Sequence, residues 1–213
     1  MNQKFIRESA YRGERALGKL GNFHVTIAGV GALGSNLLNT LSRQGFENLR
    51  AIDKDRVEEK NLGTQNYGMD DIGALKVEAA RNLVFRNVEQ EIEVVSKELT
   101  SDNIHKLLKG TNLVIDAFDN SLSRRILRDH CLSENIPCLH LGLFEGYGEV
   151  VWNADYRVPN DSDADICDYP MARNLVMLVV AIAAESIVDF ASAAIPRGTS
   201  HSVTLNDLKI SPY

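Results

Sequence analysis

The residues best suited to chemistry in this 213-residue chain are three closely spaced glycines, one lysine and two acids. Gly29, Gly31 and Gly34 follow an apolar run and form the pattern Gly-x-Gly-x-x-Gly before a predicted helix. Gly31 lets the backbone approach a phosphate, and the helix N-terminus offers free N–H groups to an anion. The pattern predicts a nucleotide or dinucleotide site, and a tight turn without a ligand is the alternative.

Two acids lie at the end of a predicted strand or just after one. Asp53 follows the first glycine by a little over 20 residues, the spacing at which an acid binds ribose hydroxyls. Its alternative role is to cap the next turn. Asp119 follows another apolar run, so it should lie at the same sheet rim as the glycines, where a carboxylate beside phosphates suggests magnesium. The alternative for Asp119 is to cap the next helix, although Asn120 or Ser121 can do so instead.

Lys76 lies in the first turns of a predicted helix that runs to about Val88. The helix dipole slightly disfavours a cation there, which makes an anion-binding role more interesting than that of an ordinary exposed lysine. The polar segment 53–65 precedes this helix, and polar loops near a glycine turn often carry function.

The elements that must position these residues predict an α/β fold. We expect a Rossmann-like, mostly parallel sheet with helices on both faces, and antiparallel pairing is allowed among the last strands. The chain is expected to form one domain, 1–213, with a helical arm at 1–20 and a crossover loop at 155–170. The expected strands lie in 23–28, 49–53, 92–95, 113–117, 136–142, 149–152 and 202–205. The other expected helices follow the glycine turn to about 45 and occupy 70–88, 101–108, 122–131 and 172–194.

Composition narrows the classes of protein. The net charge of −6 and the lack of a basic tract make nucleic acid an unexpected partner. The apolar run 174–186 is too short to span a bilayer and predicts a buried helix, and the polar N-terminus shows no secretory signal. The three cysteines include no Cys-x-x-Cys pair, which argues against a disulfide framework or a four-cysteine zinc site. We therefore expect a cytoplasmic protein that does not associate with a membrane.

Four ordered motifs are similar to those of the ThiF/MoeB/HesA family, the bacterial relatives of ubiquitin-activating enzymes. The resemblance covers about residues 20–195. The matching motifs are the glycine turn 29–35, the polar segment 53–65 with its Asp-x-Asp-x-Val-Glu-x-x-Asn-Leu-x-x-Gln spacing, Gly73 with Lys76, and the set Asp116, Asp119, Asn120 and Arg124.

The resemblance implies an enzyme that uses ATP and magnesium to adenylate the C-terminal carboxylate of a small ubiquitin-like or sulfur-carrier protein. It implies that Asp53 holds the ribose, that Asp119 holds magnesium and that Arg124 orients the Asp119 loop. It also implies a homodimer. The residues expected to bind the nucleotide are Gly29, Gly31, Ala32, Leu33, Gly34, Asp53, Asp55, Asn61, Gln65, Lys76 and Asn120. The residues expected to act in catalysis are Lys76, Asp119 and Arg124.

Two features depart from the family pattern. Thr64 stands where the family has an arginine, so one expected phosphate contact is missing. Arg12, Arg15 and Arg56 are the candidates to supply that contact instead. The zinc-binding cysteine pairs are missing, so no structural zinc is expected. Cys167 lies where some members carry a reactive cysteine, and it is either such a thiol or an inert one, since nearby acids would raise its pKa.

Three other functions compete with adenylation of a carrier protein. A non-catalytic partner or scaffold subunit is consistent with Thr64. An NAD-dependent oxidoreductase would explain the glycines and Asp53 but leaves Lys76 and Asp119 without a joint role. A tRNA-modifying branch of the family is disfavoured, because the net negative charge of the chain opposes binding to RNA.

Overall fold

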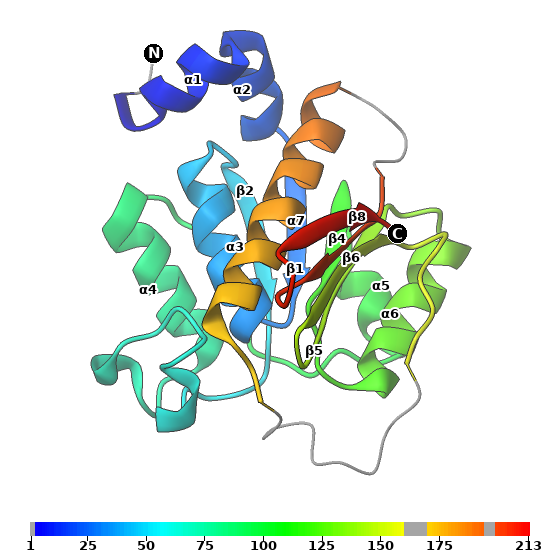
Figure 1. Ribbon diagram of the computed structural model, residues 1–213. Coiled ribbons are helices and arrows are strands. Elements are labelled where there is room, and N and C mark those ends of the chain that lie inside the picture. Colours follow the sequence, from blue (N-terminus) through cyan, green and yellow to red (C-terminus); the bar gives the residue numbers. More distant parts are fainter. Residues whose placement is uncertain (1–2, 160–169, 194–198) are drawn as a thin grey trace.

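Within the described residues, 3–159, 170–193 and 199–213 of a computed structural model, eight strands form one sheet (Figure 1). Their order across the sheet is β3-β2-β1-β4-β5-β6-β7-β8. The strands are β1 His24–Ala28, β2 Asn48–Ile52, β3 Glu93–Val95, β4 Leu113–Asp116, β5 Cys138–Phe144, β6 Tyr147–Trp152, β7 His201–Thr204 and β8 Lys209–Pro212.

The first five strands are parallel and the last three pair antiparallel. Ala28 at the end of β1 is in register with Ile52 of β2 and with Asp116 of β4. The residues that follow these three strands therefore meet at one rim of the sheet, where parallel α/β sheets bind ligands. The predicted fold class is confirmed.

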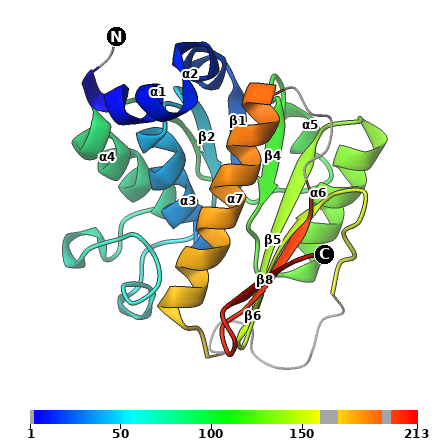
Figure 2. The same cartoon turned by 45° about the horizontal axis from the view of Figure 1, so that its top comes forward.

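Helices cover both faces of the sheet (Figure 2). Val25 and Ile27 of β1 point into a core shared with α3, α4 and α7, whereas Ala28 faces a second core shared with α5 and α6. The helices are α1 Ile6–Arg12, α2 Glu14–Gly21, α3 Ala32–Arg43, α4 Lys76–Val88, α5 Ile104–Leu107, α6 Ser121–Ser133 and α7 Arg173–Ala193. Short 3₁₀ turns occupy Gln3–Phe5, Glu59–Asn61 and Met69–Asp71. The helix expected from about residue 70 therefore begins only at Lys76, because Gly73, with a φ of 86°, separates the last of these turns from α4.

The N-terminal arm differs from the expected single helix. It is broken at Gly13, whose φ of 87° suits glycine and interrupts the helical hydrogen bonds. The arm lies on α7. The Arg12 guanidinium donates to both carboxylate oxygens of Glu185 on this helix, at 2.7 and 2.8 Å. Lys19 also donates to the carbonyl of Ser192.

The C-terminal strands also differ from expectation. β6 begins at Tyr147, so Gly148 lies inside the strand instead of in the turn. A Cβ at Gly148 would lie 2.4 Å from Cγ2 of Val179, so glycine is required for α7 to pack on this strand. The sequence prediction missed β8, which pairs with β7 at the sheet edge.

The apolar stretch is longer than the run 174–186 expected from the sequence: the span Arg173–Ser192 of α7 is long enough to cross a membrane, with a mean hydropathy of 2.0. In the fold, 56% of this span is buried. Core helices of soluble proteins share these properties, and α7 lies beside α3 in both views of the molecule (Figures 1 and 2).

Candidate active site

The glycine turn between β1 and α3 is held by three hydrogen bonds. The backbone N–H of Gly29 donates to the carbonyl of Ile52 at 2.8 Å, and that of Val30 donates to Oδ2 of Asp53 at 2.8 Å. The buried hydroxyl of Tyr67 donates to the carbonyl of Val30 at 2.6 Å. Tyr67 was not predicted as a site residue, because its role depends on how the polar loop folds back onto the turn.

The three glycines have different reasons to be glycine. Gly29 has a φ of 89°, and a Cβ there would lie 2.8 Å from the carbonyl oxygen of Ala117. A Cβ at Gly34 would lie 1.9 Å from the carbonyl oxygen of Gly29, so packing forbids it. A Cβ at Gly31 would meet only Nε2 of Gln65, at 4.0 Å. The protein's own packing therefore does not require glycine at position 31, and the open space there suits an approaching phosphate.

The loop 61–65 folds over this cradle and is tied to the start of α3. The side-chain amide of Asn36 donates to the carbonyl of Thr64 at 2.9 Å, and the N–H of Asn66 donates to the hydroxyl of Ser35 at 3.0 Å. Asn61 is buried and its Oδ1 accepts from the N–H of Glu58 at 2.9 Å. These bonds fix the loop that presents Gln65 to the glycine turn.

The Oε1 atom of Gln65 is buried and has no hydrogen-bond partner within the described residues. An orphaned buried acceptor costs free energy unless a ligand or water satisfies it. Its amide group lies beside the open position at Gly31. A nucleotide with its hydroxyl and phosphate groups fits this cradle, and α3 begins there at Ala32. The side chain of the next residue, Leu33, packs into the core and leaves only its backbone for the turn.

Lys76 and two acids form a connected group at the end of β2. Lys76 is only 9% exposed, and its ammonium lies 3.3 Å from Oδ2 of Asp55. The N–H of Asp55 donates to Oδ1 of Asp53 at 2.8 Å, so both oxygens of Asp53 accept backbone hydrogen bonds. Burial raises the pKa of Asp53, and these bonds and the charge of Lys76 oppose that shift.

Asp119 lies on the loop after β4, next to the glycine turn. The N–H of Ala117 donates to the carbonyl of Ala28 at 2.9 Å, which holds this loop against the end of β1. Asn120 is the N-cap of α6, since its Oδ1 accepts from the N–H of Ser123 at 2.9 Å. The exposed carboxylate of Asp119 is therefore not the helix cap.

The carboxylate of Asp119 on the loop after β4 suits a hard cation that needs few protein ligands. No group of three or more His, Cys, Asp or Glu side chains that could hold a metal occurs in the described part of the chain. Magnesium needs no such group, because it is commonly held by one or two carboxylates, phosphate oxygens and water. Asp119 would be the protein ligand.

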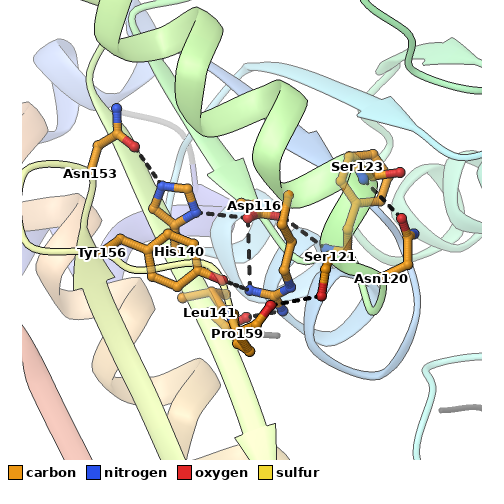
Figure 3. Close-up of polar contacts among 11 residues, drawn as sticks. Asp116, Asn120, Ser121, Ser123, His140, Leu141, Asn153, Tyr156 and Pro159 are labelled. Atoms are coloured by element: carbon orange, nitrogen blue, oxygen red, sulfur yellow. Dashed lines mark hydrogen bonds and ion pairs between the residues drawn. The ribbon is translucent and has the colours of Figure 1, made fainter. Parts of the chain in front are cut away.

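Behind this loop a buried polar network includes Asp116, His140 and Tyr156 (Figure 3). The buried Arg124 belongs to this network. Its guanidinium donates to the hydroxyl of Tyr156 at 2.8 Å and to the carbonyl of Leu141 at 2.7 Å, and it lies 3.7 Å from Oδ2 of Asp116. The same Oδ2 is 2.7 Å from Nδ1 of His140. Burial acts to raise the pKa of Asp116, but Arg124 and His140 outweigh it and the pKa is lowered.

Arg124 is connected to the Asp119 loop through Asp116. Oδ1 of Asp116 accepts from the N–H of Phe118 at 3.1 Å, at the start of the loop. The backbone N–H of Arg124 donates to the carbonyl of Asn120 at 3.2 Å, at its end. The structure thus places Arg124 where it fixes the loop from behind, and not at the rim with Lys76.

The segment 153–159 runs along α6 and extends this network. The amide of Asn153 approaches the carbonyl of Arg128 at 3.4 Å, and its Oδ1 lies 2.8 Å from Nε2 of His140. At the other end, the hydroxyl of Ser121 donates to the carbonyl of Pro159 at 2.9 Å. Sequence reasoning missed His140 and Tyr156, whose aromatic rings stack with centroids 3.8 Å apart, because this network brings together distant segments.

Two of the arginines considered as substitutes for the residue at Thr64 have other partners. Arg12 is engaged with Glu8 and Glu185 on the N-terminal arm, and Arg56 donates to the carbonyl of Gly73 at 2.7 Å. Arg15 is exposed on α2.

The cysteines divide into two groups. Cys131 and Cys138 are buried and free, as expected for core residues. Cys167 lies outside the described residues, so its role stays a prediction.

Comparison with known proteins agrees with this geometry. Residues 5–195 match the ThiF family. The SAMP-activating enzyme E1 of Haloferax volcanii is 32% identical over 139 residues, which cover 64% of this chain and 52% of that protein. The sulfur carrier protein ThiS adenylyltransferase of Bacillus subtilis is 29% identical over 154 residues, which cover 70% and 46%. The chain thus spans about half the length of these relatives.

A solved structure shares the fold. The crystal structure of E. coli MccB with ATP superimposes with a TM-score of 0.83 at 17% identity, over 100% of this chain and 71% of that one. At this level of identity the likeness establishes the fold alone.

Proposed function

The chain belongs to the ThiF family, and from this premise we propose that it is an ATP- and magnesium-dependent adenylyltransferase. Its substrate would be the C-terminal carboxylate of a small ubiquitin-like or sulfur-carrier protein. Two similar proteins are named for the activation of SAMP and the adenylylation of ThiS. The observation that carries the proposal is the loop 61–65, which places the Gln65 amide, whose Oε1 has no partner within the described residues, beside the open cradle at Gly31.

The reaction that fits this site is nucleophilic attack on the α-phosphate of ATP. A carboxylate oxygen of the carrier protein forms a bond to the α-phosphorus, the bond to the bridging oxygen breaks, and pyrophosphate leaves with that oxygen. Both reactants are anions, so their repulsion must be screened. Lys76 brings a positive charge to the rim, and the N-terminal N–H groups of α3 offer donors to a phosphate. When bound, magnesium would neutralise phosphate charge and orient the leaving group.

Positioning supplies much of the remaining rate acceleration. Asp53 holds the glycine turn through Val30, and the ribose would approach the same carboxylate. Arg124 and Asp116 hold the loop that presents Asp119. An NAD-dependent oxidoreductase would use the glycines and Asp53 but would have no role for Lys76 and Asp119 together.

The setting of this activity is part of the proposal. We expect a cytoplasmic homodimer that associates with neither membrane nor nucleic acid. α7 is a candidate for the interface between protomers, because Met177 on it is 41% exposed.

The test is ATP–pyrophosphate exchange with small ubiquitin-like proteins of the source organism, added singly. Exchange that needs one such protein and is lost in Lys76→Ala and in Asp119→Ala is the expected result. Asp70→Ala, at an exposed acid on a 3₁₀ turn, is the control and should retain exchange. Exchange that survives unchanged in both site variants would refute the proposal.

A further inference from the structure

Arg173, the first residue of α7, reaches across to the loop that covers the glycine turn. Its Nη1 lies 3.4 Å from the carbonyl oxygen of Gly63, although the two residues are 110 positions apart in the chain. Gly63 lies between Asn61 and Gln65, the two loop residues expected to contact the nucleotide. The start of α7 is thereby placed next to the phosphate cradle, and α7 continues beside α3 (Figure 2).

The guanidinium of Arg173 is free to bind an anionic ligand, whereas the other cationic side chains of this region have protein partners. Arg173 is exposed, and within the described residues its guanidinium forms no ion pair with a carboxylate. Lys76 is partly neutralised by Asp55 at 3.3 Å. Arg124 is enclosed by Asp116, Tyr156 and Leu141. Lys54, at the end of β2, pairs with Glu98 at 2.8 Å.

A nucleoside triphosphate carries more negative charge than Lys76 alone can balance. Guanidinium groups bind phosphate through two parallel N–H bonds, which makes arginine well suited to the outer phosphates. The carbonyl of Gly63 is a weak and replaceable partner at 3.4 Å, so a phosphate oxygen could take its place at little cost.

We propose that Arg173 binds the β- and γ-phosphates of the nucleotide and stabilises the pyrophosphate that leaves. The inference rests on the proposed adenylyltransferase function and names a residue of that same site. Arg173 fills the place of a cation on the loop 61–65, where this chain has Thr64 beside Gly63. The same loop is thus approached by a cation from α7, a part of the chain that lies far away in sequence.

The experiment measures the affinities of the purified full-length protein for ATP with magnesium and for AMP, in the wild type and in Arg173→Ala. The dissociation constant for ATP should rise about tenfold, as expected for the loss of a charge-assisted contact. The constant for AMP, which lacks the outer phosphates, should change less than about twofold. Arg86→Ala removes an exposed arginine from the last turn of α4 and should leave both constants unchanged.

A rescue variant separates charge from structure. Thr64→Arg places a guanidinium on the same loop, so the double variant Arg173→Ala with Thr64→Arg should regain ATP affinity. Unchanged ATP affinity in Arg173→Ala would overturn the inference while leaving the adenylyltransferase proposal standing. A loss that is equal for ATP and AMP, and that Thr64→Arg does not restore, would also overturn it. A wild-type protein that fails to bind ATP would refute both proposals.

Discussion

The carboxylate of Asp53 accepts a hydrogen bond from the backbone N–H of Val30 at 2.8 Å, so the acid at the end of β2 fixes the glycine turn after β1. The second oxygen of Asp53 accepts from the N–H of Asp55. The carboxylate of Asp55 in turn lies 3.3 Å from the ammonium of Lys76. One side chain therefore ties the phosphate cradle to the lysine expected to act in catalysis.

Asp53→Ala should weaken both the fold and nucleotide binding. The substitution leaves the N–H groups of Val30 and Asp55 without their acceptor, and we expect the free energy of unfolding to fall by about 1–3 kcal/mol. Denaturant titration gives this value, and calorimetry gives the accompanying loss of ATP affinity. The exposed Asp70→Ala is the control, with a change below about 0.5 kcal/mol. Normal ATP affinity in a folded Asp53→Ala protein would contradict the assigned role.

Gly31→Ala should separate ligand binding from stability. A Cβ at Gly31 would meet only the Gln65 amide, at 4.0 Å, so no steric clash within the described residues opposes it. We expect the free energy of unfolding to stay within about 1 kcal/mol of the wild type. ATP affinity should fall at least about tenfold, because the Cβ occupies the space of a phosphate.

Gly34→Ala is the matched variant with the opposite expectation. Its Cβ would lie 1.9 Å from the carbonyl oxygen of Gly29, so α3 must shift away from the turn. The free energy of unfolding should fall by about 1–3 kcal/mol, measured by the same denaturant titration. Equal stability of the two alanine variants would contradict the close packing of Gly34 against the carbonyl of Gly29.

Asp116→Asn should destabilise the protein by an amount that depends on pH. The pKa of Asp116 in the folded protein is lowered, against the effect of burial, by Arg124 and His140. The ionised group therefore stabilises the fold fully above about pH 5, and this contribution is lost as the pH falls below the unfolded pKa of about 3.9. At neutral pH we expect a loss of about 3 kcal/mol, because two basic side chains lose their buried partner.

The measurement for Asp116→Asn is the free energy of unfolding against pH, compared with the wild type. The difference between the two proteins should shrink as the pH falls below about 4. Asp129→Asn, at a half-exposed acid of α6 that pairs with Arg128, should change stability by less than about 1 kcal/mol at any pH. A difference for Asp116→Asn that grows on acidification would contradict this network.

Much of the site's placement follows from the sequence because it depends on strand ends. Asp53 and Asp119 each come after an apolar run, and parallel register brings such ends to one rim regardless of side-chain detail. The capping role of Asn120 was also foreseen as an option, since a polar residue before a helix is a local signal.

The remaining features depend on contacts between distant segments. Tyr67 reaches Val30, and Arg173 reaches Gly63, only because loops fold back on the glycine turn. Nothing in the local sequence around any of these residues specifies its partner. The edge strand β8 was missed for a different reason: it is short, mostly exposed and contains Pro212, so it lacks the buried alternating pattern of a predictable strand.

Calorimetric titration with ATP and magnesium, and separately with NAD, tests the central claim most directly on the wild type, Asp119→Ala and Asp70→Ala. The adenylyltransferase account predicts that ATP with magnesium binds the wild type and Asp70→Ala alike, and binds Asp119→Ala about tenfold more weakly. Binding of NAD in place of ATP, or equal affinity of Asp119→Ala for ATP with magnesium, would contradict it.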